Sequence, residues 1–137
     1  MSKCKRFRFL NGEDGQSMVE SAFVFTFLML VLLGLVDFAY VFQAYIGVVN
    51  AANVGATYGS TSATAAANQT AIAAAALAES NQWHCSNTSV NSSTSTDAYG
   101  YLKVSVTVQC QVANLIVIPN GVSAIRVSNT AVRRVRT

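Results

Sequence analysis

Residues that could take part in chemistry are few in this chain of 137 residues, and the most informative ones lie together near the N-terminus. Gly15 stands five positions before Glu20, and residues 21–36 form an apolar run without charge. A lone carboxylate at the edge of hydrocarbon costs free energy and needs a partner, a proton or water. A peptidase cut after Gly15 would supply a partner, the new amine of Gln16. Alternatively, Glu20 is a helix N-terminal acid that the helix dipole favours in the headgroup layer.

The apolar run itself predicts a membrane-spanning helix. At a rise of about 1.5 Å per residue, residues 21–36 cover about 24 Å, against about 30 Å for the hydrocarbon core. Met18 and Val19 before the run and residues 38–42 after it extend this to a full span. The alternative is a long buried helix, but so short a chain has little else with which to surround a helix that is apolar on every side.

Composition and charge agree with a small membrane-anchored protein. Hydrophobic residues make up 52% of the chain and charged residues only 11%, which is too few charges for an ordinary soluble surface. Basic residues gather at both ends of the chain: Lys3, Lys5, Arg6 and Arg8, then Arg126, Arg133, Arg134 and Arg136. The first cluster directly precedes the apolar run and predicts a cytoplasmic N-terminus, with the rest of the chain outside the cytoplasm. No A-x-A cleavage site follows the run, so we expect it to remain as an anchor.

The cysteines fit this orientation. Cys4 would lie in the reducing compartment, whereas Cys85 and Cys110 would both lie in the oxidising one and be available to pair. A disulfide between them would close a loop of about 25 residues and contribute on the order of 3 kcal/mol in the chain-entropy model. The alternative is two unpaired thiols.

Hydrophobic periodicity predicts an α+β fold: a long N-terminal transmembrane and amphipathic helix packed on a small antiparallel sheet. The helix is expected over residues 17–58, with an alanine-rich helix over 65–79 and a polar loop over 81–97. Strict alternation over residues 102–112 predicts a half-buried strand. Residues 122–135 are expected to form the return strand, with Ile125, Val127 and Ala131 facing inward.

Beyond Asp37 the long helix is expected to be amphipathic. The predicted apolar side consists of Phe38, Val41, Phe42, Tyr45, Val49, Ala52 and Ala56. The predicted polar side consists of Tyr40, Gln43, Gly47, Asn50 and Thr57. Gly34, Gly47, Gly55 and Gly59 are unfavourable inside a helix, which indicates either a bend or the close approach of another element.

Two blocks of sequence carry a resemblance to a known family. Gly15 followed by QSMVE and an apolar helix resembles the processing site of type IV pilin-like proteins, in which a prepilin peptidase cuts after a glycine and a glutamate stands fifth in the mature chain. Residues 34–42 (GLVDFAYVF) and 50–58 (NAANVGATY) are similar to TadE-like minor pilins, or pseudopilins, of the tight-adherence (Flp) system. Thr26 stands where family members often carry proline, so a straighter helix is expected. Gln16 is not apolar, which leaves N-methylation open, and TadF-like relatives remain an alternative.

This resemblance implies a function in pilus assembly and no enzymatic activity. It implies a cleaved basic leader (residues 1–15), the helix (16–58) and a small extracytoplasmic α+β domain with a pilin-like fold (59–137). The implied partners are a prepilin peptidase, other pilin subunits, the inner-membrane assembly machinery and the lipid bilayer, with no nucleic acid and no cofactor. We expect a single-pass inner-membrane protein with a periplasmic C-terminal domain, or a subunit of the extracellular pilus. Asp37 would take part in subunit packing; alternatively, it is an interfacial acid where the helix leaves the membrane.

Rival functions follow from the same residues. One is an anchored extracytoplasmic binding module that is never cut and whose polar loop contacts a ligand. A small membrane-anchored enzyme is a further candidate, but the sequence predicts no catalytic residue and no metal ligand. The single histidine, His84, lies beside Trp83 and Cys85. Without a second histidine, these residues offer too few groups for a metal site or a catalytic Cys/His pair.

Overall fold

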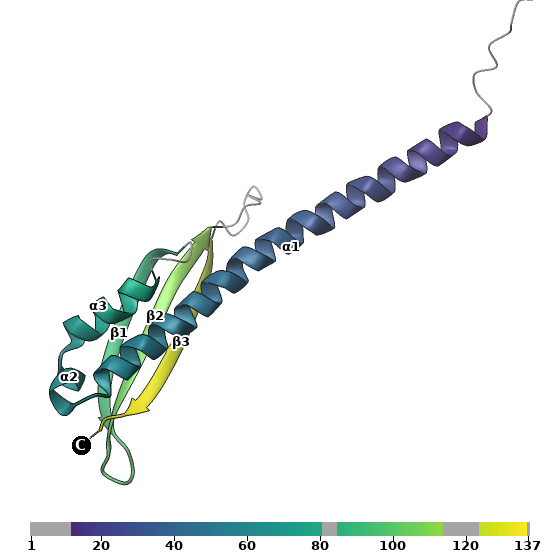
Figure 1. Cartoon of the computed structure of the whole chain (residues 1–137). Helices are drawn as coiled ribbons and strands as arrows, with labels where there is room; N and C mark the ends of the chain where they lie inside the picture. Colours follow the sequence, from purple (N-terminus) through teal and green to yellow (C-terminus); the bar gives the residue numbers. More distant parts are fainter. Residues whose placement is uncertain (1–11, 81–84, 114–123, 137) are drawn as a thin grey trace, which may run out of the picture. The chain divides into compact units, whose positions relative to one another are not determined.

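The computed structural model describes residues 12–80, 85–113 and 124–136, with side chains from residue 15 onward. Within these ranges the order of elements is a long helix, two shorter helices and then three strands (Figure 1). The chain divides between Val36 and Asp37 into two compact units. Trp83, His84 and Pro119 lie outside the described residues, as do Cys4 and the first eleven residues of the basic leader.

The first unit contains the N-terminal part of helix α1 (Gly12–Gly59). The helix predicted over residues 17–58 is therefore confirmed and begins several residues earlier. Every described side chain from residue 15 to residue 36 is exposed, including the large apolar ones. In length and composition α1 qualifies as a membrane span, and among the described residues it is the one candidate.

The hydroxyl groups inside the apolar run are satisfied by the helix backbone. Ser21 Oγ donates a hydrogen bond to the carbonyl of Ser17 at 2.8 Å, and Thr26 Oγ1 donates to the carbonyl of Ala22 at 2.8 Å. A polar group without a partner would be costly in hydrocarbon, and these bonds to the preceding turn remove that cost. The run is therefore compatible with lipid along its whole length.

The second unit is built on a three-stranded antiparallel sheet in the order β1-β2-β3. Its strands are β1 (Ser86–Thr96), β2 (Leu102–Ala113) and β3 (Ala124–Arg134). The alternation predicted for residues 102–112 is confirmed in the central strand β2. Leu102 on its inward face is half-buried, and the inward side chains that follow are buried: Val104, Val106, Val108, Cys110 and Val112.

The second part of α1 and helix α3 (Gln69–Ser80) pack on this inward face (Figure 1). The core consists almost entirely of alanine and valine, with Ile72 of α3 as its largest fully buried side chain. The predicted α+β arrangement, a long apolar N-terminal helix packed on a small antiparallel sheet, is confirmed.

The side of α1 that packs on the sheet agrees with the predicted one only in part, because Ala52 and Ala56 are buried as predicted but the aromatic residues are not. Small residues are buried there: Ala44, Gly47, Val48, Ala51, Ala52, Gly55, Ala56 and Gly59. Phe38, Phe42 and Tyr45, predicted to face inward, are exposed, and Gly47, predicted on the polar side, is buried. The reason is close approach. A Cβ on Gly55 would lie 3.1 Å from Val106 Cγ1 and 3.2 Å from Ala76 Cβ, so this face has no room for aromatic rings.

The single helix predicted over residues 65–79 is two helices, α2 (Ala63–Ala67) and α3. Asn68 separates them, and its Oδ1 accepts a hydrogen bond from the amide of Ala71 at 3.1 Å. An asparagine that bonds the backbone of the next turn competes with a continuous helix and starts a new one.

Two expectations for the sheet were also wrong. Strand β1 occupies most of the predicted polar loop over residues 81–97. It is an edge strand that forms by hydrogen bonding to β2. Its sequence shows no apolar alternation, because Val90 is its one apolar side chain. In β3, Val127 and Ala131 are buried as predicted, but Ile125 is 39% exposed near the start of the strand.

Candidate processing and assembly site

Gly15, Gln16 and Glu20 lie in the first described turns of α1, and all of them are exposed. A Cβ built on Gly15 would meet no heavy atom within 4 Å. The described fold therefore does not require glycine at this position, in contrast to Gly55. A reason for glycine here must be sought outside the packing of the described chain, for example in an enzyme that binds this segment.

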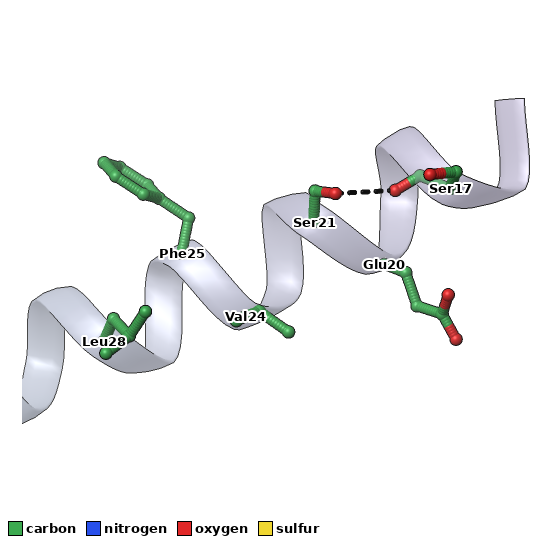
Figure 2. A pocket seen from close by; sticks show the side chains of 6 residues that line it. All are labelled: Ser17, Glu20, Ser21, Val24, Phe25 and Leu28. Atoms are coloured by element: carbon green, nitrogen blue, oxygen red, sulfur yellow. Dashed lines mark hydrogen bonds between the residues drawn. The ribbon is translucent and has the colours of Figure 1, made fainter. Parts of the chain in front are cut away.

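Glu20 borders a shallow depression on the helix surface, which Figure 2 shows with its lining side chains. Ser17, Ser21, Val24, Phe25 and Leu28 complete the lining. The Glu20 carboxylate extends away from the helix, and the Ser21 hydroxyl donates its hydrogen bond to the backbone carbonyl of Ser17. No described residue forms an ion pair with Glu20.

Gln16 precedes Glu20 by one helical turn, which corresponds to a rise of about 6 Å. Side chains four residues apart lie on the same side of a helix. An amine created at Gln16 would thus lie within one turn of the Glu20 carboxylate. The helix can bring these two charges together, in one chain or between neighbouring chains staggered by a turn.

Asp37 is not part of this arrangement. It is the first residue of the second unit and is half-buried. It precedes Ala44 by seven residues and so lies on the side of α1 that packs on the sheet. Asp37 is also engaged in an interaction within the structure. The role in subunit packing that the resemblance implies for Asp37 stays a prediction.

A disulfide joins Cys85 to Cys110, with 5.5 Å between their Cα atoms. The predicted pairing is therefore present. Cys110 is buried in the central strand, while Cys85 is half-buried just before β1. The bond fastens the start of the edge strand to the middle of the sheet.

The turn between β1 and β2 holds a polar cluster that the sequence analysis missed. Asp97 accepts hydrogen bonds at Oδ1 from the amides of Tyr99 (2.9 Å) and Tyr101 (3.1 Å). Its Oδ2 lies 2.9 Å from Arg134 Nη2 and 3.5 Å from Lys103 Nζ. The guanidinium of Arg134 also lies 5.0 Å from the centre of the Tyr101 ring. These contacts fix the turn against the end of β3.

The environment of Asp97 favours its charged form. Its side chain is only 4% exposed, and this burial opposes ionisation. The hydrogen bonds from Tyr101 and Tyr99, together with the charges of Arg134 and Lys103, outweigh the burial, and the pKa of Asp97 lies below its ordinary value.

A signal for this turn exists in the sequence, since Asp97 and Gly100 are spaced like the first and fourth residues of a type I turn. Gly100 has φ of 85°, a conformation that favours glycine.

The described residues contain no group of three or more histidine, cysteine, aspartate or glutamate side chains that could hold a metal ion. The described part of the chain is thus a disulfide-bonded α+β unit that follows a candidate membrane helix. Comparison with known protein families narrows this description for the N-terminal part of the chain. Residues 15–57 match the family described as TadE-like protein, and over this stretch the chain is TadE-like.

The match associates the chain with the tight-adherence pilus, because the TadE-like family is a family of pilus components and is not known as enzymatic. The TadE-like match implies pilus assembly partners in general. The one candidate membrane helix among the described residues is consistent with a single-pass membrane protein. Searches of curated proteins and of solved structures found no match.

Proposed function

We propose that this chain is a minor pilin or pseudopilin that acts in assembly of the tight-adherence (Flp) pilus, and that a prepilin peptidase cuts it after Gly15. The observation that carries the proposal is the TadE-like match, which begins at Gly15 itself. Residues 1–15 are then a cytoplasmic leader that is removed. Residues 16–58 form the assembly helix, and residues 59–137 form the periplasmic domain.

Two features of α1 support this role. Gly15 is a glycine that the described packing does not need, as expected where an enzyme accepts only a small residue. Glu20 lies one turn beyond Gln16 and has no ion-pair partner among the described residues, so the amine released by the cut can pair with it. Before assembly the apolar surface of α1 faces lipid, and in a pilus it packs against the helices of other pilin subunits.

N-terminal sequencing and intact-mass measurement of the membrane fraction test the cut. In cells with an active prepilin peptidase we expect a mature chain that begins at Gln16, and in cells without it the full chain from Met1. Gly15→Leu should abolish the cut. Gly34→Leu is the matched control, because a Cβ on Gly34 also meets no heavy atom within 4 Å, and this variant should be cut normally.

The rival function is an anchored extracytoplasmic binding module that keeps its leader. An intact chain in cells that process other prepilins would favour that rival and contradict the proposal. Equal cutting of the Gly15→Leu and Gly34→Leu variants would show that the glycine does not direct the cut.

A further inference from the structure

The exposed side of α1 in the second unit carries an apolar stripe that the fold does not use. It consists of Phe38, Phe42, Tyr45 and Ile46, and we call it the interfacial stripe. Phe38 and Phe42 are 67% and 52% exposed, and their rings stack with centroids 6.2 Å apart. Large apolar side chains so close together on an uncovered helix face indicate a surface that is not in contact with water in the working protein.

The position of the stripe corresponds to the outer boundary of the bilayer. A hydrocarbon core of about 30 Å takes about 20 helical residues, so a span that begins between Met18 and Ser21 ends between Asp37 and Tyr40. The headgroup layer adds about 5–7 Å, or four to five residues, and extends to Tyr45 at most. Phe38 and Phe42 therefore fall at the outer interface for either starting point.

The chemistry of the stripe fits the same place. Aromatic side chains are enriched at membrane interfaces, and a tyrosine at the outer end can keep its hydroxyl group in water. No lysine, arginine, aspartate or glutamate occurs between Asp37 and Glu79. The row that starts with Phe38, Phe42 and Ile46 continues at helical spacing as Asn50, Asn53 and Thr57. The apolar character of this row thus ends where the bilayer would end.

We propose that the interfacial stripe inserts into the outer headgroup layer of the membrane and seats the second unit on the lipid surface. One side of α1 then meets lipid as far as Tyr45, with Ile46 at the edge of the headgroup layer, while the opposite side, from Ala44 onward, already packs on the sheet. The inference requires that α1 spans the membrane, but it does not depend on the function in pilus assembly. A second copy of the chain covering the stripe is the competing arrangement.

Tryptophan fluorescence in vesicles tests the inference with the full-length chain. Trp83→Phe removes the only tryptophan, and Phe42→Trp then places a probe in the stripe. Tyr58→Trp is the matched control, because Tyr58 is 42% exposed on the same helix but lies about 20 Å further along it than Tyr45. The protein is reconstituted at high dilution in phosphatidylcholine vesicles with or without brominated acyl chains.

We expect brominated lipid to quench Phe42→Trp at least twofold and Tyr58→Trp hardly at all, independently of protein dilution. Equal quenching of the two probes, or no quenching of either, would overturn the inference. A blue-shifted Phe42→Trp signal that brominated lipid does not quench would also overturn it, in favour of a second copy covering the stripe.

Discussion

Asp97 is the residue whose surroundings depend most clearly on charge. Its folded pKa lies below the ordinary value, so the ionised carboxylate stabilises the fold. This contribution is present above the unfolded pKa of about 3.9 and is lost as the pH falls through the folded pKa.

We expect Asp97→Asn to lower the thermal midpoint at pH 7, with a difference from wild type that shrinks below about pH 4. Asp97→Ala should cost more at pH 7, because it also removes the acceptor for the Tyr99 and Tyr101 amides. Thermal unfolding followed by circular dichroism at several pH values measures both effects, and a pH-independent difference for Asp97→Asn would contradict this assignment.

Glu20 allows cutting to be separated from assembly. Replacement by glutamine keeps the size of the side chain but removes the charge that would pair with the amine of Gln16. Because Glu20 is exposed, the fold should not change. We expect Glu20→Gln to be cut at the normal position but to lower the yield of surface pili at least several-fold. Glu79→Gln on α3 is the control and should leave both unchanged. Normal piliation of the Glu20→Gln variant would assign Glu20 to the headgroup layer alone.

At the scale of elements, the small residues of α1 determine how closely the helix approaches the sheet. Gly55 packs so closely against Val106 and Ala76 that a side chain at this position has no room. Gly55→Leu must therefore push α1 away from β2 and α3. We expect a loss of roughly 1–3 kcal/mol in the free energy of unfolding of the full chain in detergent micelles, as for other overpacked cores. Gly34→Leu adds the same atoms to open space and should change it by less than about 0.5 kcal/mol. Equal effects of the two variants would contradict the proposed close packing.

The same elements show which features of the fold can be predicted from sequence. The alternation in β2 and the long apolar part of α1 are strong local patterns, and both were predicted correctly. The buried side of α1 was predicted only in part, because hydrophobicity ranks Phe42 above Ala44, whereas the available space against the sheet selects the smaller residue. Strand β1 has little pattern of its own and depends on its pairing with β2. Gly15 and Glu20 stand out by their spacing, and their roles stay predictions. The Asp97 cluster could not be predicted, because the β2–β3 register brings Arg134 beside Lys103.

For the whole molecule, the core of the second unit explains why a covalent bond is needed. Its buried side chains are nearly all alanine and valine, which bury little apolar area each and so contribute modestly to the free energy of folding. The disulfide between Cys85 and Cys110 compensates by restricting the unfolded chain, an effect of about 3 kcal/mol for a loop of this length in the chain-entropy model.

Reduction should therefore destabilise the second unit strongly. In a Cys4→Ser background, where Cys85 and Cys110 are the only cysteines left, we expect a reductant to lower the free energy of unfolding by about 2–4 kcal/mol. Urea unfolding of the full chain in micelles, with and without reductant, measures the difference, and a mobility shift on reduction verifies the bond. Because edge strand β1 has few apolar contacts, it should lose amide-exchange protection before β2 does. An unchanged unfolding curve after verified reduction would mean that the alanine and valine core is sufficient by itself.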